Sequence, residues 1–105
     1  MLNQKKLNSK ILELLKTGLF KTATFTGTLP VTGANSYWDI TFSNGSAPQG
    51  YTPVGIISLN TGSSNAGISG YYLNGSGIPI AYGRTFGAQT ATAQANAVVL
   101  YTKTL

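Results

Sequence analysis

After Gly18 the sequence alternates between short β-prone runs and clusters of turn-forming residues, and no other feature limits the fold more. Runs rich in Val, Ile, Thr and aromatic residues, separated by Gly, Asn, Pro and Ser at such intervals, are typical of an antiparallel sandwich or barrel. We expect strands near residues 19–26, 35–43, 53–60, 66–73, 78–86 and 91–103. The sequence therefore predicts an all-β fold, namely a small antiparallel, jelly-roll-like β-sandwich.

Two of the predicted turns contain an Asn-Gly pair, Asn44-Gly45 and Asn74-Gly75. Both residue types tolerate the positive φ angles that tight hairpins need. Because Ser follows each pair, both also match the N-glycosylation pattern. The chain has no evident export signal, so we interpret both pairs as hairpin turns.

The N-terminal segment has a different pattern. Leu7, Ile11 and Leu14 follow one another at spacings of four and three, which places them on one face of a helix predicted over residues 2–17. A helix this short is marginal in water on its own, so the stripe needs a partner. Either the β domain or sister helices can cover it, and the coiled-coil-like spacing favours bundling. We expect a helical neck of residues 1–18 and a head domain of residues 19–105.

The residue types that most enzymes depend on are scarce. The chain has no His and no Cys, which removes the usual neutral-pH base, the thiol nucleophile and the common zinc ligands. The two side-chain carboxylates, Glu13 and Asp39, belong to different predicted elements and are not expected to form an acid–base pair. We predict that the protein is not an enzyme and uses no cofactor and no metal ion.

The net charge of +5 is concentrated near the N-terminus, where five of the seven basic residues lie within the first 21 positions. Beyond that segment the charged residues are Asp39, Arg84 and Lys103. Basic and aromatic residues are not interleaved as they are in single-strand nucleic-acid binders. No apolar run approaches the roughly 18 residues of a membrane span. We therefore expect neither nucleic acid nor a membrane as a partner.

Strand alternation assigns the faces of the predicted sandwich. Trp38, Ile40 and Phe42 share one face of their strand and are expected in the core. Residues 54–59 are apolar on both faces, which implies cover from the helix or from a neighbouring subunit. Residues 91–101 place a row of alanines on one face, either a thin part of the core or a subunit contact. We predict a homo-oligomer whose contacts include Leu7, Ile11, Leu14, Ile57, Val98 and Leu100.

Residue types that recognise saccharides gather in the C-terminal half of the chain. The candidates are Tyr71, Tyr72, Asn74, Tyr82 and Arg84. Aromatic faces stack on the C–H surfaces of sugars, while amide and guanidinium groups bond to hydroxyls. The same composition builds tyrosine-rich protein interfaces, so core or subunit packing is the alternative. Arg84 is the sharpest candidate, because a lone Arg among so few charges either faces a ligand or pairs with Asp39.

Four stretches carry a resemblance to a known group of proteins: Thr-Phe-Thr-Gly-Thr-Leu at 24–29, Tyr-Trp-Asp-Ile-Thr-Phe at 37–42, residues 50–57 with Asn-Thr-Gly at 60–62, and Ala-Val-Val-Leu-Tyr at 97–101. Residues 25–103 thereby resemble the C-terminal β domains of tail-fibre, baseplate and receptor-binding proteins from bacteriophages and prophages of Gram-positive bacteria. The resemblance implies a homotrimer on a virion, assembled in the host cytoplasm. It also implies contacts with other virion proteins and with host cell-wall polysaccharide or teichoic acid.

Host attachment and tail or capsid decoration are both compatible with that resemblance. Two other functions remain open on the sequence. One is a monomeric carbohydrate-binding module with an exposed aromatic platform. The other is a purely structural virion assembly protein whose helix inserts into a larger particle.

Overall fold

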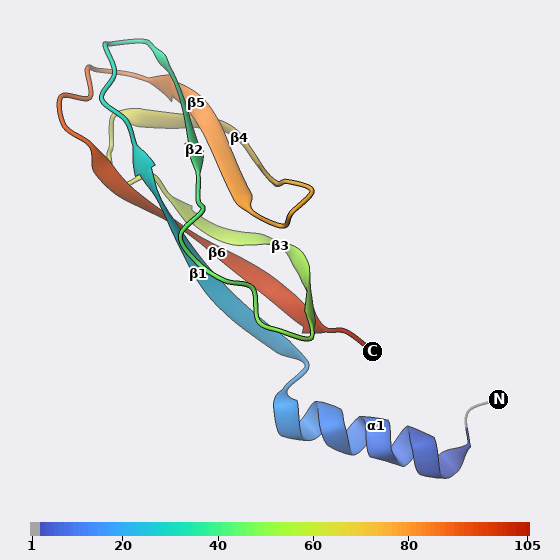
Figure 1. The fold of residues 1–105 in the computed structure, drawn as a ribbon. Helices are drawn as coiled ribbons and strands as arrows, with labels where there is room; N and C mark the ends of the chain where they lie inside the picture. The colour runs from blue at the N-terminus through green and yellow to red at the C-terminus, as the bar shows by residue number, and fades with distance from the viewer. Residues whose placement is uncertain (1–2) are drawn as a thin grey trace.

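The computed structural model describes residues 3–105, with the backbone alone for residues 14–17. Within that range one helix precedes six strands, as the sequence predicts (Figure 1). In chain order they are α1 (Gln4–Thr17), β1 (Phe20–Leu29), β2 (Tyr37–Thr41), β3 (Tyr51–Asn60), β4 (Ala66–Leu73), β5 (Pro79–Thr85) and β6 (Ala93–Lys103).

The strands form two three-stranded antiparallel sheets, with the orders β1-β6-β3 and β2-β5-β4. The sheets pack face to face (Figure 1), which confirms the predicted small all-β sandwich. Only β4 and β5 are both consecutive in the chain and paired with each other. Every other connection crosses from one sheet to the other, so most neighbours within a sheet are distant in sequence.

The hydrophobic core lies between the inner faces of the two sheets. Trp38, Ile40 and Phe42 are no more than 2% exposed, which confirms the predicted core face. The sheet β1-β6-β3 contributes inward-facing residues of β1 and β6: Phe25, Leu29, Ala95, Ala97, Val99 and Tyr101. Ala95 and Ala97 of the predicted row therefore belong to the core of the same chain, while Ala93 is partly buried against it and Ala91 is exposed before β6.

The predicted end of the first strand at residue 26 and the predicted hairpin at Asn44-Gly45 were both wrong, and the arrangement of the two sheets explains both. The strand β1 runs through Gly27 to Leu29 because this glycine lets the sheets approach closely; a Cβ there would lie 2.6 Å from Cγ2 of Ile40. Asn44-Gly45 does not join a hairpin, because β2 and β3 belong to different sheets. Asn44 instead exchanges backbone hydrogen bonds of 2.9 and 3.1 Å with Thr26. The predicted turn at Asn74-Gly75 does connect the hairpin of β4 and β5. The positive φ of this turn is at Gly77 (75°) and not at the Asn-Gly pair.

The helix α1 begins and ends at residues suited to those positions. The side-chain Oδ1 of Asn3 accepts a hydrogen bond of 2.9 Å from the backbone N–H of Lys6, which caps the first turn. Gly18 follows the helix with a φ of 84°, the left-handed conformation that ends many helices. The hydroxyl of Tyr51 then donates a 2.9 Å hydrogen bond to the Gly18 carbonyl, which ties the end of the helix to β3.

The helix projects from one end of the sandwich and lies against neither sheet (Figure 1). The molecule is accordingly elongated, at 62 × 21 × 18 Å. Leu7, Ile11 and Leu12 are 41%, 46% and 57% exposed. The side chain of Leu14, the remaining member of the predicted seam, lies outside the described residues. The chain's own head therefore leaves the described part of the apolar stripe uncovered.

Candidate functional site

The outer face of the sheet β2-β5-β4 gathers three tyrosines and two opposite charges. Alternation turns Tyr37 and Asp39 of β2, Tyr82 and Arg84 of β5, and Tyr72 of β4 away from the core. Antiparallel pairing sets Tyr37 opposite Arg84 and Asp39 opposite Tyr82. We call these five residues the tyrosine face. It brings together three of the five predicted ligand-binding residues.

Tyr82 is the central aromatic residue of this face. Its partner in β4 is Gly70, and a Cβ at that position would lie 2.6 Å from Cζ of the Tyr82 ring. The missing side chain leaves space for the ring to lie across the neighbouring strand, a known use of glycine beside an aromatic residue in a sheet. Tyr82 is 37% exposed. The sheet thus holds one face of the ring and leaves the remainder available to a ligand.

Tyr37 and Asp39 interact along the same strand. The Tyr37 hydroxyl donates a hydrogen bond of 3.4 Å to Oδ2 of Asp39. Partial removal from water raises the pKa of the Tyr37 phenol above its ordinary value of 10, with further contributions from the charge and hydrogen bond of Asp39 and from Tyr72 and Tyr82. A phenol hydroxyl can both donate and accept hydrogen bonds, so this face offers both functions to a ligand.

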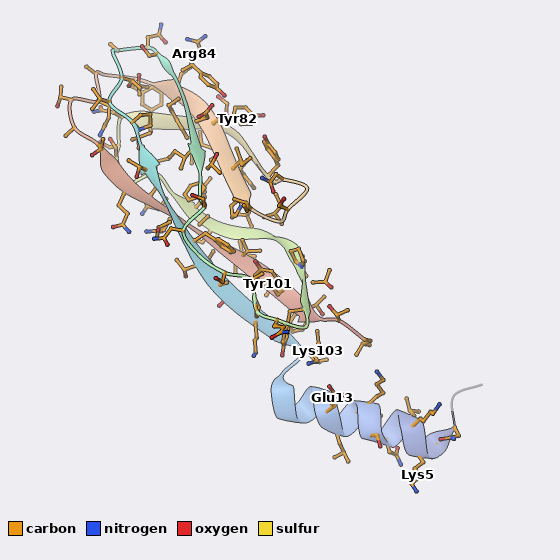
Figure 2. The ribbon with its side chains drawn as sticks, viewed as in Figure 1. Lys5, Glu13, Tyr82, Arg84, Tyr101 and Lys103 are labelled. Carbon is orange, nitrogen blue, oxygen red and sulfur yellow. The ribbon has the colours of Figure 1, made fainter. Side chains whose placement is uncertain are left out.

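Arg84 lies at the end of the head farthest from α1 (Figure 2). Its Nη1 donates a 3.2 Å hydrogen bond to the backbone carbonyl of Asn35. Among the described residues it forms no ion pair with Asp39, because the register places the two diagonally rather than opposite each other. The sequence analysis offered Arg84 two roles, facing a ligand or pairing with Asp39. The pairing with Asp39 is not found among the described residues.

The structure separates the other two predicted ligand-binding residues from this face. Tyr71 lies on the same side of β4 as Leu73, the side that faces the other sheet. Because β4 is an edge strand, Tyr71 remains exposed there. The Oδ1 atom of Asn74 accepts hydrogen bonds of 2.9 and 3.0 Å from the backbone of Ser76 and Ile78. The Asn74 side chain thus shapes the hairpin turn.

Tyr37 and Asp39 were missing from the predicted site. The alternation of their strand places both on the face opposite Trp38, so their outward orientation follows from the sequence. Their nearness to Tyr82 and Arg84 does not, because it depends on the pairing of β2 with β5 across more than 40 residues of chain. A local pattern contains no information on that pairing.

Three of the six residues predicted to form subunit contacts lie on the sheet β1-β6-β3. Val98 and Leu100 are half-buried on its outer face, and Ile57 is 57% exposed at a register shift of β3. Next to Ile57 a groove of about 150 Å³ opens between the edges of the two sheets. Its lining, which we call the β3–β4 edge, consists of Ile56, Ile57, Ser58, Leu59, Ile68 and Tyr71.

A second, polar groove of about 580 Å³ lies at the opposite edge, between β1, β2 and the start of β6. Hydroxyl and amide side chains dominate its lining, and no aromatic residue contributes to it. Thr26 and Asn44 bond to each other there, at 3.0 Å between the amide nitrogen and the hydroxyl oxygen. The groove offers hydrogen-bonding groups without a stacking surface, which distinguishes it from the tyrosine face.

In residues 3–105 no group of His, Cys, Asp or Glu side chains is placed to hold a metal ion. No helix of this part of the chain is long and apolar enough to cross a bilayer. Glu13 lies on α1 and Asp39 on β2 in the head, so the two carboxylates do not share a cleft.

Comparisons with known proteins found no relative for this chain. No protein-family model matches the sequence, and no significant match was found among curated proteins or among solved structures.

Proposed function

We propose that this protein is a non-enzymatic, homotrimeric virion module that attaches to a host cell-surface saccharide through its tyrosine face. The observation that supports this function most directly is the arrangement of Tyr37, Tyr72 and Tyr82 on one exposed sheet surface that also carries Asp39 and Arg84. In a head with so few charges, both charged groups of this sheet lie on this one surface.

The chemistry of the face suits a sugar. Phenol rings provide apolar area for the C–H surface of a pyranose, and their hydroxyls provide donors and acceptors at the rim. Rings held by a β-sheet lose little conformational entropy on binding. The sequence-level resemblance to phage receptor-binding domains agrees with this role, and Arg84 lies at the end of the head remote from the helix (Figure 2).

Two uncovered apolar surfaces support assembly from several copies. The first is the stripe of α1, which projects into solvent with Leu7 and Ile11 exposed. The second is the β3–β4 edge, which adds Ile57, Ile68 and Tyr71 at 45–57% exposure. Soluble monomers seldom leave such surfaces open. A bundle of three α1 helices would cover the stripe in the way that coiled-coil seams are covered.

A saccharide-binding experiment tests the attachment function. The full chain is applied to an array of bacterial cell-wall glycans, and the affinity for the best glycan is then measured by calorimetry. We expect Tyr82→Ala and Tyr37→Ala each to weaken binding at least about tenfold, as the loss of an aromatic contact residue commonly does. The control is Gln94→Ala in the polar groove, which removes a lining side chain but no ring.

The outcomes separate the alternatives. Loss of binding in Gln94→Ala with full binding in Tyr82→Ala would move the site to the polar groove. Absence of binding to every glycan would leave the purely structural virion protein as the better description. Circular dichroism of each variant establishes that the head is still folded.

A mass measurement tests the trimer. Light scattering after size-exclusion chromatography should give three times the 11.0 kDa mass of the chain. The double substitution Leu7→Gln and Ile11→Gln should convert the trimer to smaller species, whereas Ser9→Gln, on the opposite side of the helix, should not. A stable monomer of the unaltered chain at micromolar concentration would contradict the proposal and favour a monomeric carbohydrate-binding module.

A further inference from the structure

We infer that the tyrosine face selects an acidic saccharide, whose carboxylate or phosphate group binds Arg84 while a neighbouring sugar hydroxyl binds Asp39. This inference rests on the proposed saccharide site and adds the chemical class of its ligand. It follows from the placement of a donor-only group and an acceptor-only group at diagonal positions of one aromatic surface.

The guanidinium of Arg84 has donors to spare. It carries five N–H groups in a planar fork, and the described residues engage one nitrogen, Nη1, through the carbonyl of Asn35. Arginine binds carboxylate and phosphate groups bidentately, and such charge-assisted bonds are about twice as strong as neutral ones. An exposed Arg with a single hydrogen bond to the backbone can therefore receive an oxyanion from solution.

The neighbours of Arg84 on this face are aromatic and carry no charge. Its partner in β2 is Tyr37, and its partner in β4 is Gly67, which has no side chain of its own. The ring of Phe86 packs on that glycine, since a Cβ at Gly67 would lie 2.7 Å from Cζ of Phe86. Phe86 itself is exposed. Arg84 thus has an aromatic neighbour on either side of it in the sheet, and no acidic side chain lies directly opposite it in either strand.

Asp39 is placed to bind a different part of the same ligand. An ionised carboxylate only accepts hydrogen bonds, so it suits sugar hydroxyls and repels an anion. Diagonal neighbours in an antiparallel pair lie roughly 7–8 Å apart, which is the expected separation of Asp39 from Arg84. A ligand with an oxyanion at one end and hydroxyls further along matches this order, and a neutral sugar would leave Arg84 without a counter-charge.

No other cation of the head competes for the anion. Between Asp39 and Lys103 the only charged residue is Arg84. The remaining lysines of the head, Lys21 and Lys103, lie 4.9 and 5.1 Å from the Tyr51 ring centroid, next to the helix. Because the Debye length at physiological ionic strength is about 8 Å, their field is largely screened at Arg84, at the other end of the head (Figure 2).

The test uses matched pairs of ligands and the full chain. Affinities are measured for a glucuronate-containing oligosaccharide and its carboxyl-reduced form, and for a phosphate-substituted oligosaccharide and its dephosphorylated form. We expect the acidic member of at least one pair to bind about tenfold more tightly, which corresponds to one charge-assisted contact. The pair that shows the larger ratio identifies carboxylate or phosphate as the source of the charge.

Substitutions then assign the preference to one residue. Arg84→Gln should bring the acidic-to-neutral ratio close to one, Arg84→Lys should keep part of it, and Lys10→Gln on α1 should leave it unchanged although it removes the same charge. The ratio should also fall as salt is raised from 50 to 500 mM. Equal affinities for acidic and neutral ligands that still depend on Tyr82 would overturn the inference and leave the saccharide site intact. A preference that survives in Arg84→Gln, or no saccharide binding at all, would overturn it as well.

Discussion

The helix and the sandwich differ in how far they bury their apolar side chains. The sandwich hides Trp38 and Phe42 almost completely within a single chain. The helix α1 hides neither Leu7 nor Ile11, although both lie on a regular apolar stripe. A sheet face finds its cover in a second sheet of the same chain, whereas a projecting helix of 14 residues has no such partner.

The core between the sheets lies within one chain, whereas the apolar stripe of α1 and the β3–β4 edge are left open. In the proposed trimer, the head folds on its own core and other copies cover the open surfaces. Four substitutions test that division, each through the free energy of unfolding of the full chain. All should be measured at one protein concentration, because association shifts apparent stability.

The largest effect is expected for Trp38→Ala. Removal of this ring from the centre of the core should cost about 3–5 kcal/mol, in the range for buried aromatic residues. Urea denaturation followed by circular dichroism measures the loss. The control is Tyr37→Ala on the same strand, whose side chain points outward and should cost less than about 1 kcal/mol. If the two substitutions cost the same, the head does not depend on its own core.

Gly83→Ala should have the next largest effect. A Cβ at this position would collide with the Gly67 carbonyl oxygen and lie 2.9 Å from Cζ2 of Trp38, so β4, β5 and the Trp ring would have to move apart. We expect a loss of about 1–3 kcal/mol from this overpacking. Gly75→Ala is the matched control, because nothing lies within 4 Å of its Cβ position. A neutral Gly83→Ala variant would indicate that the inner face is less tightly packed than described.

Tyr51→Phe tests the joint between the two regions. It removes the hydroxyl that bonds to the Gly18 carbonyl at 2.9 Å but keeps the ring that Lys21 and Lys103 contact. We expect a loss of about 0.5–1.5 kcal/mol, the net value of one hydrogen bond. Glu13→Gln, which breaks the 3.9 Å contact with Lys103, should cost less, since exposed ion pairs contribute little. Small-angle scattering should report a wider range of helix orientations for Tyr51→Phe.

The smallest effect at neutral pH is expected for Tyr101→Phe. The Tyr101 hydroxyl is buried without a hydrogen-bond partner among the described residues, so its removal should change stability by less than about 1 kcal/mol. Burial raises the pKa of Tyr101 above 10, so the unfolded chain loses this proton first and stability falls as pH rises beyond 10.

The pH dependence distinguishes this prediction from a simple packing effect. The stability of Tyr101→Phe should depend less on pH than that of the unaltered chain as pH rises above 10, while the raised pKa of Tyr37 maintains part of the dependence in both. An unchanged slope would contradict a buried, protonated Tyr101. Thermal melts across this range provide the measurement.

The sequence by itself determined the class of fold and one face of the core. Alternation with a period of two assigned Trp38, Ile40 and Phe42 to the inside, and the period of three to four residues assigned the stripe of α1. Both patterns are local properties of the backbone, which is why they can be read without knowing any partner. For the same reason, turn-forming residues were less informative where a glycine such as Gly27 served packing between sheets.

The tertiary structure alone decided which outward residues form a common surface. Tyr37 meets Arg84, and Asp39 meets Tyr82, because β2 pairs with β5 in one specific register. Tyr71 is excluded because it has the opposite parity to its neighbour Tyr72 and turns toward the β3–β4 edge. Pairing between distant strands depends on long-range contacts, and a shift of one residue would reverse every side chain. The period fixes what faces outward, but only the register brings those residues together.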